Sequence, residues 1–143
     1  MQRDSALMFT RGLIEYIGRE RKLKRSDVVR AMGKDVIERV YRHADVLHSE
    51  PIEHVASEYI QLARIPVGSF DNIGACRYEA PDFWAIGEVY ERLVEDAPCN
   101  GPIEGIIEVY TSWIDDAISN YNSDFFYQPR YYLRECYLAG KPL

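Results

Sequence analysis

The stretch PIEGIIEVYTSWIDDAISNY, residues 102–121, carries the strongest structural signal in the chain. Its apolar residues recur at intervals of three and four over about five turns, which is the period of a buried helix face. They are Ile103, Ile106, Ile107, Tyr110, Ile114, Ala117, Ile118 and Tyr121. Proline is well suited to the first turn of a helix. The sequence therefore predicts one long core helix from Pro102 to about Tyr121.

Helical periodicity continues on the N-terminal side of this segment. Four helices are predicted there, and they span residues 5–22, 26–32, 34–47 and 51–64. Ser26 can cap the second helix, Gly33 can end it, and Pro51 can begin the fourth. Residues 65–81 contain two prolines and two glycines and show no sustained period, so they predict an irregular connection.

The C-terminal part adds two further helices on either side of that prominent stretch. Asp82 can cap a helix that runs to about Ala97, and Pro129 can begin a last helix that Gly140 ends. We therefore predict a single all-α domain, a compact bundle of six or seven helices. Within it, residues 5–64 form a four-helix N-terminal unit and residues 82–140 a three-helix C-terminal unit.

The three cysteines and the N-terminal residues predict the cellular compartment of the protein. Cys76, Cys99 and Cys136 are odd in number and far apart, which is typical of free thiols in a reducing compartment. Charged residues interrupt the apolar residues of positions 1–22, so we expect neither a signal peptide nor a membrane span there. We expect a cytoplasmic protein with no membrane partner and no cofactor.

The net charge of −6 is unevenly distributed along the chain. Residues 1–42 carry 11 Lys and Arg against 6 Asp and Glu, a net of +5, and residues 43–143 carry 6 against 17, a net of −11. The basic run RERKLKR, residues 19–25, could bind nucleic-acid phosphates through Arg21, Lys22, Lys24 and Arg25. A DNA-binding regulator is therefore one alternative. Acidic residues on the exposed side of the helix 34–47 disfavour binding in a DNA groove. A solvated loop or an acidic protein partner is therefore favoured for the basic run.

All three histidines lie in YRHADVLHSEPIEH, residues 41–54. A metal site needs ligands that converge, but at about 100° per residue His43 and His48 are roughly 140° apart around their helix. His54 belongs to the next helix. We therefore predict no metal site in this stretch.

The segment RHADVLH, residues 42–48, resembles the motif of Arg, polar residue, four residues, His in the HEPN group of all-helical RNases. The resemblance implies that Arg42 and His48 act on the scissile phosphate, usually across a homodimer. A histidine that titrates near neutrality can move a proton while a guanidinium stabilises the developing phosphate charge. Two features depart from that pattern. The motif follows the third of seven predicted helices, and His48 falls within the apolar arc of its helix.

Residues 9–60 resemble a family of short bacterial helical domains of unknown function. The shared features are an apolar first helix with the pair Ile14-Glu15, a short second helix, and the segment from Tyr41 to His48 that leads into a last helix. Members of that family are often encoded beside, or fused to, toxins that resemble ADP-ribosyltransferases. The resemblance implies an accessory or antitoxin-like role in which Leu47 and His48 are structural.

Residues 121–137 are dense in aromatic side chains. Several are expected to pack the last two helices together. The others offer a recognition surface, because tyrosine is enriched at interface hot spots. The predicted partner-binding residues are Phe125, Phe126, Tyr127 and Tyr131. We therefore predict a non-enzymatic protein that binds a protein partner or forms a homodimer, with the RNase and the DNA-binding regulator as alternatives.

Overall fold

The computed structural model describes residues 4–143, and this part of the chain is all-α, as predicted. It contains eight α-helices and one short 3₁₀ helix. They are α1 (Ser5–Arg21), α2 (Arg25–Arg42), α3 (Ala44–Leu47), α4 (Ile52–Ala63), α5 (Phe83–Asp96), α6 (Pro102–Tyr110), α7 (Ile114–Ser119), η1 (Phe125–Tyr127) and α8 (Arg130–Ala139). No helix within these residues has both the length and the apolar character that crossing a membrane requires.

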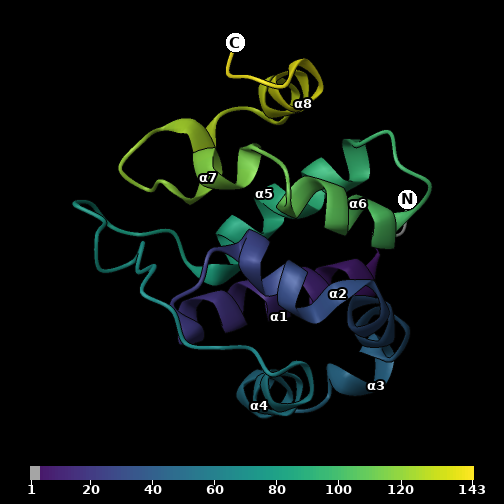
Figure 1. Cartoon of the computed structure of the whole chain (residues 1–143). Helices are drawn as coiled ribbons and strands as arrows, with labels where there is room; N and C mark the ends of the chain where they lie inside the picture. Colours follow the sequence, from purple (N-terminus) through teal and green to yellow (C-terminus); the bar gives the residue numbers. More distant parts are fainter. Residues whose placement is uncertain (1–3) are drawn as a thin grey trace.

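Helix α1 lies at the centre of the bundle and contacts α2, α4 and α5. Figure 1 shows α4 on one side of α1, α5 and α6 on the other side, α2 in front of α1, and α8 as an outer layer beyond α5. The hydrophobic core is a single cluster that includes Leu13, Ile17, Val28, Ile86 and Ile106. Side chains from before and after the connection at residues 65–81 therefore share one core.

The helix ends in the N-terminal half follow the sequence signals with two corrections. Gly33 introduces the predicted break as a kink within α2, where its φ of 74° is a conformation that glycine adopts readily. Ser26 is not the cap of this helix. It lies in the first turn, and its backbone N–H donates to the Asp115 carboxylate from α7 at 3.2 Å. The predicted helix 34–47 also divides, because His43 leaves the helical conformation before α3 begins.

The predicted long helix over residues 102–121 is wrong at its centre, where a turn separates α6 from α7. The Thr111 hydroxyl donates to the Ile107 carbonyl oxygen at 2.5 Å, and the Ser112 hydroxyl donates to the Val109 carbonyl oxygen at 2.7 Å. The Ser112 hydroxyl oxygen also accepts the Ile114 N–H at 3.3 Å. Such local side-chain bonds compete with the regular helical ladder. The turn redirects α7 so that Asp115 enters the core.

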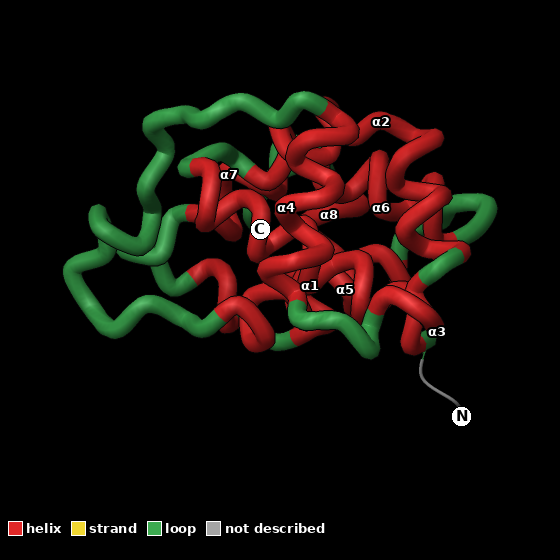
Figure 2. Tube along the Cα trace, turned by 90° about the horizontal axis from the view of Figure 1, so that it is seen from below, coloured by secondary structure: helices red, strands yellow, loops and turns green. Residues whose placement is uncertain are grey.

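The connection between α4 and α5 is irregular, as predicted, but it is fixed to the rest of the molecule. The Gly68 N–H donates to the Arg21 carbonyl oxygen at 2.7 Å, and the Phe70 N–H donates to the Lys22 carbonyl oxygen at 2.8 Å. The Asn122 side-chain amide donates to the Ala75 carbonyl oxygen at 3.0 Å. Figures 1 and 2 accordingly show this connection and the loop after α7 at the same end of the molecule.

Candidate functional site

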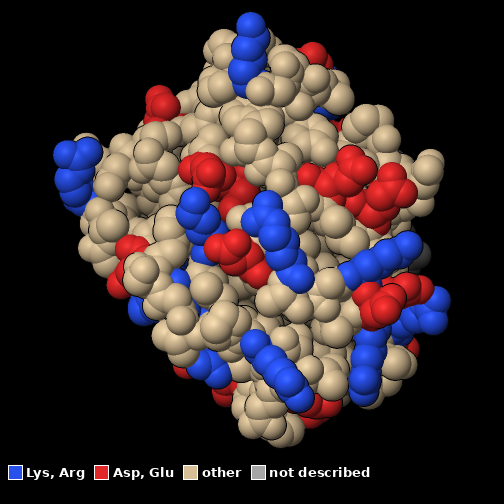
Figure 3. Space-filling model, viewed as in Figure 1, with Lys and Arg blue, Asp and Glu red and all other residues tan. Residues whose placement is uncertain are grey.

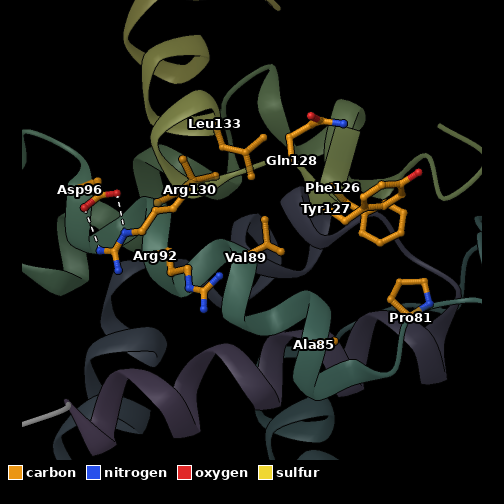
Figure 4. A pocket seen from close by; sticks show the side chains of 11 residues that line it. Pro81, Ala85, Val89, Arg92, Asp96, Phe126, Tyr127, Gln128, Arg130 and Leu133 are labelled. Atoms are coloured by element: carbon orange, nitrogen blue, oxygen red, sulfur yellow. Dashed lines mark hydrogen bonds and ion pairs between the residues drawn. The ribbon is translucent and has the colours of Figure 1, made fainter. Parts of the chain in front are cut away.

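A recess between α5, η1 and α8 contains two of the predicted partner-binding residues. We call it the aromatic recess. Its volume is about 240 Å³, and residues lining it include Val89, Arg92, Phe126, Tyr127, Arg130 and Leu133. Figure 4 shows the two aromatic rings side by side at one end and Arg130 with Asp96 at the other.

The two aromatic rings of the recess are held differently. Phe126 is half-buried and packs edge-on against the buried Tyr121 ring at a centroid distance of 5.6 Å. Tyr127 packs edge-on against Phe126 at 5.0 Å, and 67% of its surface is exposed. Phe126 therefore anchors the aromatic pair to the core, and Tyr127 is open to a partner.

The opposite end of the recess is defined by charged groups. The Arg130 guanidinium donates from Nε to Asp96 Oδ2 at 2.9 Å and from a terminal nitrogen to Asp96 Oδ1 at 2.8 Å, which ties α8 to α5. The hydrogen bond to Asp96 raises the pKa of Arg130 above its ordinary value. Arg92 pairs with Glu88, one turn earlier on α5, at 2.5 Å. The recess thus combines an apolar floor, an exposed tyrosine and two guanidinium groups.

The other two predicted partner-binding residues lie outside this recess. Phe125 is half-buried, and its ring packs against Trp113 at 6.1 Å and Tyr132 at 6.4 Å. It contributes to the packing of η1 and α8, and its predicted partner-binding role stays a prediction. Tyr131 lies on α8 with 65% of its surface exposed.

A second and larger recess, of about 770 Å³, contains both residues of the RNase alternative. We call it the α1–α3 groove, because α1, the end of α2 and α3 form most of its walls. Residues lining it include Met8, Phe9, Tyr41, Arg42, His48 and Trp84, together with Asp45. His48 is exposed and does not lie within a buried arc, because the break at His43 turns α3 away from the line of α2. Arg42 and His48 therefore line one groove, and their nuclease role stays a prediction.

Each of these two recesses brings exposed aromatic and charged side chains together. Comparison with known proteins adds no further site. The chain matches no protein-family model, and no curated protein or solved structure matches it. The candidate sites therefore follow from the geometry of this chain.

The basic run proposed for nucleic-acid binding is largely paired within the protein. Arg25 is 1% exposed and pairs with Glu15 at 2.8 Å, so it cannot contact a phosphate where it lies. Lys24 pairs with Asp116 at 3.1 Å and Lys22 pairs with Asp71 at 3.5 Å. Arg21 is half-buried. Figure 3 shows basic and acidic side chains interspersed over the face that carries α2.

The three histidines do not gather into a metal site. The His54 Nδ1 lies 3.0 Å from Glu50 Oε1, and the His48 Nδ1 lies 3.1 Å from the Ala44 carbonyl oxygen. Within residues 4–143, one group of three residues has ligand atoms within 4.8 Å of one another, and it consists of Cys99, Glu104 and Glu108. Burial and then the two glutamates raise the pKa of the Cys99 thiol, which favours its protonated form. The spacing of Glu104 and Glu108, one helical turn apart, is the only signal of this group in the sequence.

Several charged side chains are buried and join helices to one another. Their burial was not predicted from the sequence. Arg11 donates to Glu91 at 2.9 Å and to the Trp84 carbonyl oxygen at 3.0 Å, which joins α1 to α5. Glu15 and Arg25 join α1 to α2. None of the four charged side chains lines either recess. They bridge helices instead of facing a ligand.

Proposed function

We propose that this protein is a non-enzymatic accessory protein that binds a protein partner through the aromatic recess, in an antitoxin-like or regulatory role. The observation that carries the proposal is Tyr127, which is 67% exposed at the edge of an apolar recess. Tyrosine and arginine are enriched among the residues that dominate binding energy at protein interfaces. Arg92, which pairs with the half-buried Glu88, also lines the recess and is placed to contact the same partner.

Contacts between the walls of the recess also hold its side chains in place. Phe126 is seated on Tyr121, and the paired hydrogen bonds between Arg130 and Asp96 fix α8 on α5. A surface that is already ordered loses less conformational entropy when a partner binds. The side chains around Tyr127 therefore supply a preformed support for a partner's apolar side chain.

The test is capture of the partner from the native host with the tagged full-length chain, followed by comparison of two tyrosine variants. Tyr127→Ala removes the exposed ring at the recess. Tyr78→Ala removes an equally exposed ring, 69% against 67%, on the connection between α4 and α5. We expect Tyr127→Ala to weaken partner binding by about tenfold or more, whereas Tyr78→Ala leaves it unchanged.

The double variant Phe125→Ala with Tyr127→Ala also removes the packing of Phe125 against Trp113 and Tyr132 beside the recess. It should weaken binding further, and circular dichroism shows whether the helices persist.

A partner encoded beside this chain's gene would support the antitoxin-like role. Sedimentation of the purified chain tests the homodimer, which Tyr127→Ala should dissociate if the recess is the dimer contact. Equal binding by the Tyr127→Ala and Tyr78→Ala variants would refute the proposed contact.

A further inference from the structure

We infer that the α1–α3 groove binds a small organic anion with an aromatic or other apolar ring body and one carboxylate group. The groove is separate from the aromatic recess, so the inference does not depend on the proposed function. Its volume is about 770 Å³. Small-molecule sites in proteins are commonly about 300–1,000 Å³, mostly apolar, with a few polar groups that fix the orientation of the ligand.

The walls of the groove suit a flat apolar ring. Phe9, Tyr41 and Trp84 contribute aromatic rings from three different helices, and Met8 adds a flexible apolar side chain. Trp84 is 49% exposed, so much of its surface is available to a ligand. The Tyr41 hydroxyl already donates to the Asp4 carboxylate at 2.5 Å. Tyr41 therefore offers the groove its ring more readily than its hydroxyl.

Arg42 and His48 supply the donors for a carboxylate. Arg42 uses one terminal nitrogen for Glu38, and a guanidinium has five N–H donors, so others remain for a ligand. The His48 Nδ1 lies 3.1 Å from the Ala44 carbonyl oxygen. With Nδ1–H donating to that oxygen, Nε2 is the ring atom left to meet a ligand, and it is a donor when the ring is protonated. Arginine binds carboxylates through two parallel hydrogen bonds, which gives both affinity and orientation.

The same lining disfavours a polynucleotide in the groove. A nucleic-acid strand would bring several phosphates against a lining that also contains Asp45, and Glu38 already occupies part of the Arg42 guanidinium. Most of the remaining lining is apolar, and it offers few donors to those phosphates beyond the Ser5 hydroxyl and the Trp84 indole N–H. A ligand with a single carboxylate needs only Arg42 and His48, and its ring can cover the apolar wall at the same time.

The experiment uses 2-naphthoate as the probe and the full-length chain as the protein. Isothermal titration measures affinity, and two-dimensional NMR follows the indole N–H signals of the two tryptophans, Trp84 and Trp113, assigned with a Trp84→Phe variant. We expect saturable binding that shifts the Trp84 signal and leaves that of Trp113 in place, because Trp84 lines the groove and Trp113 does not. The uncharged analogue 2-naphthalenemethanol should bind about tenfold more weakly, since it lacks the carboxylate.

Matched variants locate the carboxylate. Arg42→Ala and His48→Ala should each weaken 2-naphthoate binding, by about tenfold for Arg42→Ala. Arg30→Ala breaks another exposed ion pair within α2, with Asp27, and His54→Ala removes the exposed histidine that pairs with Glu50. Both controls lie outside the groove and should bind as the unaltered protein does. All four changes are at exposed positions, so folding is expected to be retained.

Three results would overturn the inference. The first is no binding of 2-naphthoate at millimolar concentration. The second is a failure of either affinity comparison. The protein would then bind 2-naphthoate and 2-naphthalenemethanol equally well, or the Arg42→Ala and Arg30→Ala variants would bind 2-naphthoate equally well. The third is cleavage of single-stranded RNA that His48→Ala abolishes and His54→Ala retains, which would assign the groove to phosphate chemistry. None of these results affects the Tyr127 test of the proposed function.

Discussion

Glu15 of α1 and Arg25 of α2 form a two-point ion pair in the interior of the protein. The Arg25 Nε lies 3.0 Å from Glu15 Oε1, and a terminal Arg25 nitrogen lies 2.8 Å from Glu15 Oε2. Burial opposes the charge on Arg25, but the Glu15 carboxylate outweighs it and raises the pKa of the guanidinium. Arg25 also donates to the Leu23 carbonyl oxygen at 2.7 Å. The pair therefore fixes the turn between α1 and α2.

Removing the charge of Glu15 should destabilise the fold strongly. In Glu15→Gln the Arg25 charge stays buried without its partner, and breaking a buried pair on one side typically costs about 3–5 kcal/mol. Urea unfolding followed by circular dichroism measures the loss. Glu88→Gln breaks the exposed pair with Arg92 and should cost less than about 1 kcal/mol. Similar losses in the two variants would contradict the structural role of the buried pair.

Two glycines of α1 should respond to alanine in opposite directions. A Cβ at Gly18 would lie 2.3 Å from Arg25 Cδ, and the buried guanidinium is held by hydrogen bonds to Glu15 and the Leu23 carbonyl oxygen. Gly18→Ala should therefore destabilise the protein by about 1–3 kcal/mol or more. A Cβ at Gly12 meets only Trp84, at 3.9 Å, so Gly12→Ala should gain about 0.5–1 kcal/mol from helix propensity. Thermal unfolding measures the stability of the two variants. An equal change in stability in Gly18→Ala and Gly12→Ala would refute this prediction.

The stacked pair Tyr90 and Tyr110 gives a second matched test. Their rings lie 4.2 Å apart and nearly parallel, and both side chains are almost fully buried. The Tyr90 hydroxyl donates to Asp115 at 2.6 Å, so Tyr90→Phe should cost about 1–3 kcal/mol. The Tyr110 hydroxyl has no hydrogen-bond partner within residues 4–143, so Tyr110→Phe should be neutral or stabilising. Chemical denaturation measures both, and a larger loss for Tyr110→Phe would contradict this assignment.

Asp115 should make stability depend on pH. Burial raises its pKa above the ordinary value of 3.8, and the bonds from Tyr90 and Ser26 only partly oppose this effect. A group whose pKa is raised on folding stabilises the protein below its unfolded pKa, and that contribution is lost as pH rises through the folded pKa. The free energy of unfolding of the unaltered protein, minus that of Asp115→Asn, should therefore fall as pH rises from about 4. Asp116→Asn, at an exposed position, is the charge-matched control. A difference that rises with pH would show that the carboxylate is stabilised in its charged form.

The local elements of this fold could be predicted because their signals lie within a few residues. Asp82 caps α5 by accepting the Ala85 N–H at 2.8 Å, and Gly140 ends α8 in the left-handed conformation. The turn between α6 and α7 was missed, although Thr111 and Ser112 carry its cause. The hydroxyl of Thr111 or Ser112 can either face solvent or bond to a carbonyl oxygen of the preceding turn. The spacing of apolar residues continues across both positions in either case. Periodicity alone does not distinguish these two outcomes.

The candidate sites were only partly predictable for a related reason. Local aromatic density predicts Tyr127 as a partner-binding residue. Its ring is exposed at the edge of the aromatic recess, and its binding role stays a prediction. The packing of Phe126 against Tyr121 and the hydrogen bond from Arg130 to Asp96 depend on how the chain folds back to bring α8 against α5. The basic run, by contrast, suggested a charged surface that the structure divides between ion pairs and a buried arginine.

Helix type and position are therefore encoded locally, because a repeating apolar face and a capping residue act over one or two turns of the chain. The fate of the charged residues is not encoded locally. Arg25 reads as one of five basic residues in a run of seven, and it is buried only because Glu15 and Asn72 meet it from other segments. Arg42 and His48 likewise share a groove because α1 and Trp84 close it. Burial, pairing and recesses depend on contacts between distant segments, and those contacts exist only once the helices have packed.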